Sequence, residues 1–203
     1  MTPEPEPFAG RIAAVLLAAG GSSRLGRPKQ LLVWRGEPLV RRAARAALDA
    51  EVDELIVVAG ADRAAIDDAL DGLAVRVVTH TAWAEGIGSS IACGVRAASA
   101  DAVLLLLSDQ PAIDSALLRQ LVDAGRAGHE RVACLYAGVL GVPALFAGKP
   151  ALSVLSGLEG DHGAQALLAR EPGSVFAIAA EQASFDVDDE RDWTRWKEQH
   201  DAD

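Results

Sequence analysis

Residues 12–30 read IAAVLLAAGGSSRLGRPKQ, an uncharged apolar run that ends in a loop rich in glycine and serine. The apolar part, Ile12–Leu17, has the length and composition of a buried strand. Small residues after a strand let backbone N–H groups approach phosphate oxygens, and Arg24 and Lys29 supply the positive charge that neutralises them. The stretch therefore predicts a strand followed by a loop that binds a nucleoside triphosphate.

Two familiar phosphate-binding motifs do not fit this loop. A P-loop requires Lys and then Ser or Thr after its second glycine, but Arg27 and Pro28 follow Gly26. A dinucleotide fingerprint requires Gly-x-Gly-x-x-Gly, a spacing that Gly20, Gly21 and Gly26 do not have. The loop thus argues against a dinucleotide-dependent oxidoreductase. The alternative to a phosphate site is an ordinary strand–helix loop with two solvated cations.

Strand and helix patterns alternate along the first half of the chain. Short apolar runs predict strands at Ile12–Leu17, Glu54–Ala59, Val75–Thr79 and Ala102–Leu107. Segments between them predict helices at Pro38–Ala50, Asp62–Leu70 and Ser89–Ala98, the last with a serine pair suited to an N-cap. This rhythm predicts an α/β fold of three layers, a mostly parallel sheet with helices on both faces.

The second half of the chain is less regular. We expect helices at Ser115–Ala124, Ala151–Leu155, Ala164–Ala169 and Glu190–Gln199, and strands at Arg131–Tyr136, Val142–Phe146 and Val175–Ala179. No linker or repeat divides the chain, so we expect one domain over residues 11–203. Alternating prolines predict a disordered lead over residues 1–10.

Composition narrows the class of partner. A net charge of −10 argues against nucleic-acid and anionic-membrane surfaces, and makes a local cationic loop notable. Without an apolar stretch long enough for a membrane span, and without a signal-peptide pattern, we expect a cytoplasmic protein. Cys93 and Cys134 have neither metal-ligand spacing nor a disulfide pattern, so we expect both to be inert thiols.

Carboxylates follow the predicted strands at positions suited to a metal ion. Asp109 comes directly after the apolar strand Ala102–Leu107, at the strand end where ligands of parallel sheets bind. Asp186 and Asp188 form an i, i+2 pair that points one way if the segment is extended. Mg²⁺ prefers one or two carboxylates together with phosphate oxygens, so Asp109 is a candidate ligand, and Asp188 of this pair can supply the second oxygen while Asp189 begins the helix. The alternatives are a turn aspartate at 109 and a helix cap at Asp188 or Asp189.

Two glycine-rich segments precede predicted helices. In the first, Gly86 and Gly88 lead to Ser89 and Ser90, whose hydroxyl and N–H groups suit a base, a ribose or a phosphate. An ordinary loop with a capping serine is the alternative. In the second, residues 157–163, Asp161 lies near the second substrate or simply caps the next helix.

These residues resemble a known family. Leu17-Ala18-Ala19-Gly20, with Arg24 and Lys29, resembles the signature of nucleotidyltransferases with a glycosyltransferase-A-like fold, and most closely that of molybdenum cofactor cytidylyltransferases. Segments 83–90, 108–111, 141–146 and 160–167 agree with the family in order, as does the closing Asp186-Val187-Asp188. The chain departs from the family pattern at Val142 and at Asp189-Glu190.

The resemblance implies a reaction and a role for each site residue. It implies transfer of CMP from CTP to the terminal phosphate of the molybdenum–molybdopterin cofactor, with Mg²⁺ and release of pyrophosphate. Arg24, Lys29 and Asp109 would be catalytic, and Asp109 and Asp188 would hold the metal. The nucleotide would contact Leu17, Ala18, Ala19, Gly20, Gly21, Arg24, Lys29, Gly86, Gly88, Ser89 and Ser90. The acceptor would contact Gly141, Pro143, Asp161 and Asp186.

The same motifs leave other assignments open. The double alanine favours CTP over the GTP of guanylyl relatives, and the recipient of the product would be a molybdoenzyme. One rival is nucleotidyl transfer to another small phosphorylated acceptor, such as a sugar phosphate. A rival of a different class is a non-catalytic chaperone that binds nucleotide or cofactor.

Overall fold

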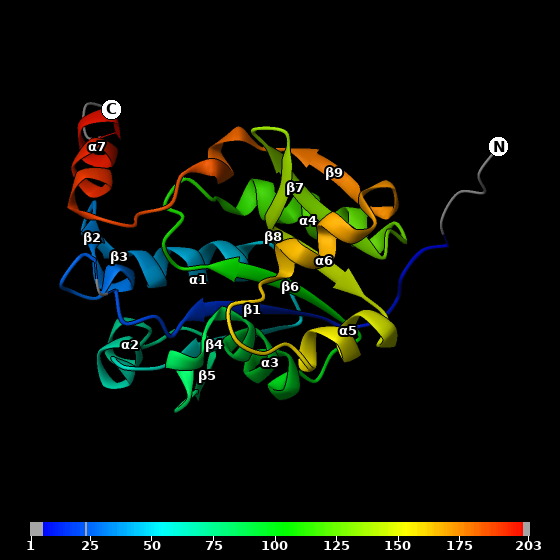
Figure 1. Cartoon of the computed structure of the whole chain (residues 1–203), viewed down its shortest axis with the longest axis horizontal. Helices are drawn as coiled ribbons and strands as arrows, with labels where there is room; N and C mark the ends of the chain where they lie inside the picture. The colour runs from blue at the N-terminus through cyan, green and yellow to red at the C-terminus, as the bar shows by residue number, and fades with distance from the viewer. Residues whose placement is uncertain (1–5, 23, 201–203) are drawn as a thin grey trace.

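Seven strands form one sheet in the order β5-β4-β1-β6-β8-β7-β9 in the computed structural model, which describes residues 6–22 and 24–200 (Figure 1). The strands are β1 (Ile12–Ala18), β4 (Glu54–Ala59), β5 (Arg76–Thr79), β6 (Ala102–Leu107), β7 (Arg131–Tyr136), β8 (Val139–Ala147) and β9 (Phe176–Ala179). Neighbouring strands pair in parallel except that β8 is antiparallel to both β6 and β7. The predicted mostly parallel sheet is confirmed.

Helices cover both faces of this sheet, as expected. They are α1 (Leu39–Asp49), α2 (Arg63–Ala69), α3 (Ile87–Ala97), α4 (Ser115–Arg126), α5 (Lys149–Ser156), α6 (Ala164–Arg170) and α7 (Glu190–His200). Short 3-10 helices are η1 (Lys29–Leu31), η2 (Trp83–Glu85), η3 (Pro172–Ser174) and η4 (Glu181–Ser184). Helices α1 and α4 pack on one face, and α3, α5 and α6 on the other, which gives three layers.

The central strand β1 shows why the chain folds in layers. Alternate side chains point to opposite faces of a strand. Ile12, Ala14 and Leu16 accordingly join the core under α1 and α4, whereas Val15 and Leu17 join the core under α3, α5 and α6. A strand buried on both faces needs a continuous apolar run, which is what residues 12–18 provide.

Two tight hairpins were not predicted. Arg35 and Gly36 link β2 (Val33–Trp34) to β3 (Glu37–Pro38), and Ala137 and Gly138 link β7 to β8. All four linking residues have positive φ, between 48° and 79°, as two-residue hairpin turns require. Because of the second hairpin, β8 begins three residues before the expected Val142.

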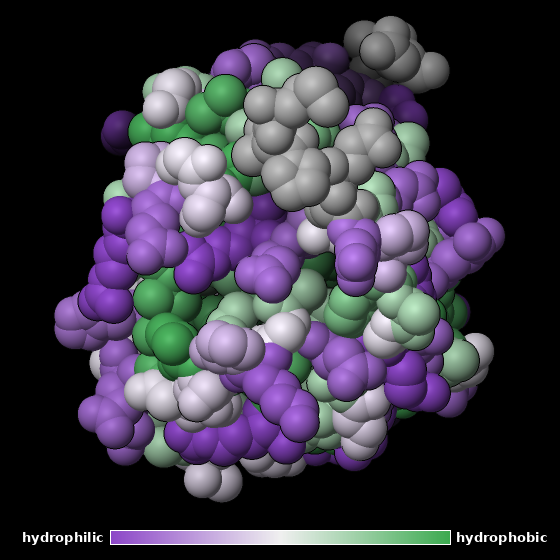
Figure 2. All heavy atoms as spheres, turned by 90° about the vertical axis from the view of Figure 1, so that its right-hand side faces the viewer, coloured by the Kyte–Doolittle hydropathy of each residue, from purple (hydrophilic) through white to green (hydrophobic). Residues whose placement is uncertain are grey.

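Different elements lie at the two ends of the sheet. At the end where the parallel strands finish, α7 lies beside β2 and β3 (Figure 1). Figure 2 shows the opposite end of the molecule, where apolar residues form small patches between polar ones. No helix in the described ranges is long and apolar enough to cross a membrane. Residues 1–5 of the expected lead lie outside the described part, but Phe8 is anchored: its N–H donates to Arg126 O at 2.9 Å.

Candidate nucleotide and metal site

The predicted loop and Asp109 meet at the carboxyl ends of β1 and β6. These strands pair in parallel with Leu17 opposite Leu107, and the N–H of Ser108 donates to Leu17 O at 3.3 Å. Each strand therefore delivers its following loop to the same edge of the sheet. Asp109 is buried there, only 8% exposed.

Gln30, which the sequence analysis missed, folds the loop back on itself. It is 2% exposed, and its Nε2 donates to Gly20 O at 3.3 Å. The hydroxyl of Ser22 donates to Gln30 Oε1 at 3.3 Å and accepts the N–H of Lys29 at 2.9 Å. The loop is thus held in shape by its own polar groups. The only signal for Gln30 was its place directly after Lys29.

Beyond these bonds the loop is open on one side. A Cβ built on Gly20 would meet no atom of the described residues within 4 Å, whereas Ala18 and Ala19 are buried. Gly21 lies against the ring of Trp83, which a Cβ there would approach to 2.7 Å. Gly20 therefore offers exposed backbone to a ligand, as the phosphate-binding prediction requires.

Lys29 lies between the two carboxylates assigned to the metal. Its Nζ forms an ion pair with Asp109 Oδ2 and another, of 3.2 Å, with Asp188 Oδ1. Burial alone would lower the pKa of Lys29, but the two carboxylates outweigh it and raise the pKa above its ordinary value of 10.5. Lys29 is therefore a permanent cation in this site.

Arg24 approaches the same carboxylate from the solvent side. Its side chain is 74% exposed, and Nη1 lies 3.1 Å from Asp188 Oδ2. A neighbouring pair joins Arg27 to Glu190 at 2.9 Å. The structure thus brings Arg24, Lys29, Asp109 and Asp188 together, although they come from three distant segments.

Asp109 and Asp188 fit a divalent cation that substrate phosphates also hold. Asp109 Oδ1 is buried and has no hydrogen-bond partner in the described part of the chain, which leaves one carboxylate oxygen for a ligand. Asp188 is half exposed beside it. No group of three or more His, Cys, Asp or Glu residues suited to a metal occurs among residues 6–22 and 24–200. The pair matches the few protein carboxylates that Mg²⁺ uses with substrate phosphates.

Asp188 is positioned by the cap of α7. Asp189 Oδ1 accepts the N–H groups of Arg191 at 2.8 Å and Asp192 at 3.0 Å, so Asp189 caps the helix. Asp192 in turn accepts the N–H groups of Asp188 and Asp189, each at 3.2 Å. Asp189 therefore caps α7, whereas Asp188 is left to pair with Arg24 and Lys29.

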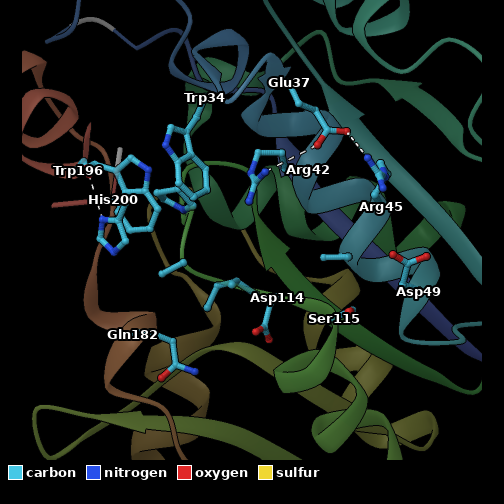
Figure 3. Close-up of a pocket in the computed structure, with 14 residues that line it drawn as sticks. Trp34, Glu37, Arg42, Arg45, Asp49, Asp114, Ser115, Gln182, Trp196 and His200 are labelled. Carbon is cyan, nitrogen blue, oxygen red and sulfur yellow. Dashed lines mark hydrogen bonds and ion pairs between the residues drawn. The ribbon is translucent and has the colours of Figure 1, made fainter. Parts of the chain in front are cut away.

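An aromatic cluster docks α7 against the β2–β3 hairpin (Figure 3). The rings of Trp34 and Trp196 meet edge to face with centroids 5.0 Å apart, and His200 stacks on Trp196 at 3.7 Å. Arg42 lies over the Trp34 ring at 4.2 Å. These residues line a cavity of about 510 Å³, which includes none of the predicted site residues.

The segment Gly86–Ser90 is held by the second glycine-rich loop. The N–H of Gly88 donates to Gly160 O at 2.8 Å, and a Cβ on Gly88 would come within 2.7 Å of Glu159 O. Gly86 has φ 123° and is itself the N-cap of α3, so the prediction of a serine cap is wrong. The physical reason is that this close crossing of two backbones requires glycine.

Ser89 has different neighbours from those expected. Its hydroxyl donates to Gly86 O at 2.7 Å and lies 2.8 Å from His80 Nε2. It lines a separate cavity beside His80 and Cys93. Ser90 is buried within the first turn of α3. The Ser89 hydroxyl is thus already bonded within the protein.

Another cavity, of about 420 Å³, is lined by Gln110, which follows Asp109, and by most of the predicted acceptor residues. Gly141, Asp161 and Asp186 line it, whereas Pro143 does not. Its walls are mainly apolar, formed by Leu17, Ile87, Ile91, Leu105, Leu107, Tyr136 and Val142. Asp161 does not cap α6, because Gly163 is the N-cap. Gln110 and Tyr136 were missed as lining residues.

Asp186 lines this cavity and lies close enough to Asp109 to be repelled by its charge. Although the residue keeps exposed surface, partial burial and then repulsion from Asp109 raise its pKa to about 6. A hydrogen bond from Gln110 and the charge of Lys29 act in the opposite direction and lower the pKa of Asp186.

The two cysteines fit the predicted inert thiols. Burial alone raises the pKa of Cys134 to about 12, and Cys93 is half-buried with a raised pKa.

Relatives of this chain carry several different names. Nicotine blue oxidoreductase of Paenarthrobacter nicotinovorans is 34% identical over 87% of this chain and 92% of its own length. Purine catabolism protein PucB of Bacillus subtilis is 28% identical over 88% and 90%. A probable molybdenum cofactor guanylyltransferase of Opitutus terrae is 32% identical over 61% and 60%.

Solved structures share the whole fold. Rv0371c of Mycobacterium tuberculosis superposes with a TM-score of 0.81 at 31% identity, over 94% of this chain and all of that chain. A second structure of Rv0371c, in complex with manganese, gives a TM-score of 0.77 at 29% identity, over 93% and 98%. The model of the MobA-like NTP transferase domain matches residues 14–175, which include the loop, Lys29 and Asp109. The chain therefore belongs to the MobA-like NTP transferase domain family and is a nucleotidyltransferase of that family.

Proposed function

We propose that this protein transfers CMP from CTP to a terminal phosphate of the molybdenum–molybdopterin cofactor and releases pyrophosphate. One observation carries the proposal: two cations, Arg24 and Lys29, converge with two carboxylates, Asp109 and Asp188, beside the open backbone of Gly20. A triphosphate needs the cations and the loop, and a metal needs the carboxylates. A protein that only binds a nucleotide would not need both the cations and the two carboxylates.

The reaction requires positioning more than acid–base chemistry. A phosphate oxygen of the acceptor attacks the α-phosphorus of CTP, and the bond from that phosphorus to the bridging oxygen of pyrophosphate breaks. The attacking phosphate is already ionised near neutral pH, so no side chain needs to remove its proton. Lys29 and Arg24 neutralise the charge that develops on the phosphates.

Asp109 and Asp188 would hold the divalent cation. When bound, such a cation supplies charge neutralisation and orients phosphate oxygens. Asp109 is fixed by its strand and offers the buried, unpartnered Oδ1, and Asp188 is fixed by the cap of α7. The manganese complex of Rv0371c supports a divalent metal, with Mg²⁺ as the cation we propose.

The cavity of about 420 Å³ supports an acceptor that carries both apolar surface and polar groups. Aliphatic side chains and the ring of Tyr136 make up much of its wall, which favours a ring system over a sugar phosphate. Its polar lining includes Gln110 and Asp186, which lie near Asp109, and also Asp161, His162 and Gln165. These polar side chains can pair with the polar groups of a heterocyclic acceptor, and the named guanylyltransferase relative favours a molybdenum cofactor.

The choice of nucleotide rests on the sequence of the first loop. Ala18 and Ala19 follow the cytidylyl pattern, so we propose CTP and keep GTP as the alternative. The test offers CTP, GTP, ATP and UTP separately, with Mg²⁺, with and without molybdenum cofactor, and follows pyrophosphate. Release that requires CTP and the cofactor together supports the proposal. Release with GTP in place of CTP refutes the nucleotide assignment alone.

The relative named nicotine blue oxidoreductase favours a second candidate, a redox reaction in the same apolar cavity. The chain lacks the dinucleotide fingerprint, which argues against this candidate. Consumption of NADH or NADPH in the presence of an aromatic dye, with no pyrophosphate from any nucleotide, would establish it in place of transfer.

A further inference from the structure

The ammonium group of Lys29 occupies the position between the two carboxylates that are proposed to hold the metal. Nζ contacts Asp109 directly and lies 3.2 Å from Asp188, and the side chain is only 23% exposed. Partial burial weakens the screening of these ion pairs by water. In the protein alone, one cation thus already neutralises the carboxylate pair.

A divalent cation on the same carboxylates would lie close to this ammonium group. Like charges repel strongly at such distances in a partly buried site. Lys29 and the metal therefore cannot both interact fully with Asp109 and Asp188. Arg24 adds to the conflict, because it also pairs with Asp188, although from the solvent side.

The side chain of Lys29 can move to resolve the conflict. Its backbone is fixed, because its N–H donates to Ser22 Oγ at 2.9 Å and the residue begins η1. The four-carbon stem of lysine is flexible, and the open backbone at Gly20 lies on the same loop. Phosphate groups at that loop would give the ammonium group an alternative anionic partner.

We propose that Lys29 competes with the divalent cation for Asp109 and Asp188 in the free protein, and that nucleotide phosphates end the competition by accepting its ammonium group. The proposal rests on the metal site of the proposed function. It makes metal and nucleotide binding cooperative, because each raises the affinity for the other by the same factor. A loaded site then forms from metal and nucleotide together, and the metal alone binds weakly.

The test measures Mn²⁺ affinity directly, from the electron paramagnetic resonance signal of free Mn²⁺, without nucleotide and with CTP. Lys29→Gln removes the competing charge and should bind Mn²⁺ alone more tightly than the wild type, by about fivefold or more. CTP should enhance Mn²⁺ binding strongly in the wild type and much less in Lys29→Gln. Circular dichroism checks that the variant is folded, and Lys29→Met replaces it if it is not.

Two further variants identify the cause. Lys29→Arg keeps a cation and should bind Mn²⁺ as the wild type does. Lys149→Gln removes an exposed charge at the start of α5 and should also match the wild type. Equal or weaker Mn²⁺ binding by folded Lys29→Gln, including no binding by either protein, overturns the proposal.

The test of the Lys29 competition can fail or succeed independently of the test of nucleotidyl transfer. If the competition fails but pyrophosphate still forms from CTP and acceptor, only the proposal about Lys29 falls. If Lys29→Gln binds Mn²⁺ more tightly but no nucleotide and acceptor react, the competition stands and the proposed transfer falls.

Discussion

The backbone N–H of Val187 donates a hydrogen bond of 3.0 Å to the carbonyl oxygen of Asp109. It joins the end of β6 to the segment before α7, and Val187 is fully buried in the aromatic cluster that docks α7. The bond places Asp188 next to the loop that carries Asp109. The site therefore depends on the docking of a terminal helix as well as on the sheet.

Trp196→Ala tests that dependence. Trp196 is 3% exposed and contacts both Trp34 and His200, so its loss should destabilise the protein by about 3–5 kcal/mol. Asp188 should then lose its fixed position, and Mn²⁺ binding in the presence of CTP should weaken. Urea unfolding and Mn²⁺ titration measure the two effects. Glu198→Ala, an exposed position on the same helix, is the control and should change neither.

Gly88→Ala tests the crossing of the two glycine-rich segments. The added Cβ would lie 2.7 Å from Glu159 O and 2.8 Å from His162 O, and backbone carbonyls cannot rotate away. We expect a loss of about 1–3 kcal/mol in the free energy of unfolding. Gly173→Ala, where a Cβ meets no described atom within 4 Å, should be nearly neutral. Equal stability of the two variants would show that the crossing is not tight.

Gly20→Ala separates binding from folding. Its Cβ would enter the open side of the loop and meet no atom of the described residues within 4 Å, so thermal stability should stay unchanged. A bound triphosphate would lose its close approach to the backbone, and CTP affinity should fall by about tenfold or more. Calorimetric titration with CTP and Mg²⁺ measures this. Unchanged affinity would remove the loop from the phosphate site.

The raised pKa of Asp186 predicts a pH dependence of stability. Its pKa is about 6 in the folded protein and 3.8 by ordinary value, so between these limits the folded state holds a proton that the unfolded state has lost. The free energy of unfolding therefore falls as pH rises through this interval and stays lower above it. Because the residue keeps exposed surface, the change should be modest.

Asp186→Asn is neutral at every pH and should lack this loss. Urea unfolding without metal measures the difference in the free energy of unfolding between the variant and the wild type. Above about pH 6 this difference should favour the variant more than it does at about pH 4. A stability difference that does not vary with pH would show that the carboxyl ionises normally.

The sequence predicts those parts of the site that follow from strand ends. A fully apolar run such as Ile12–Leu17 or Ala102–Leu107 fits a buried strand, and in a parallel sheet the residues after each run share an edge. That logic places Lys29, Arg24 and Asp109 in one crevice. Asp188 followed from an alternating carboxylate pair, and its neighbour Asp189 from the capping preference of aspartate.

Three features of the structure could not be predicted from the local sequence pattern. Gly88 was interpreted as a flexible ligand loop, but its lack of a side chain serves a contact with Gly160 that is far along the chain. The hairpin turn at Arg35 carries a non-glycine residue with positive φ, which local preference disfavours. Gln30 holds the first loop in shape through side-chain hydrogen bonds to Ser22 and Gly20. A loop has no periodic pattern from which such bonds could be predicted.

The most direct test of nucleotidyl transfer follows the α-phosphorus of CTP in a single turnover. CTP labelled with ³²P at the α-position is mixed with enzyme, Mg²⁺ and molybdenum cofactor, and the products are separated. We predict that the label moves to the cofactor in the wild type, and that Asp109→Asn, which keeps the shape of the side chain but not its charge, slows transfer by about 100-fold or more. Label that stays entirely in CTP while the nucleotide is bound by folded wild-type protein, with GTP, ATP and UTP equally unreactive, would contradict the account.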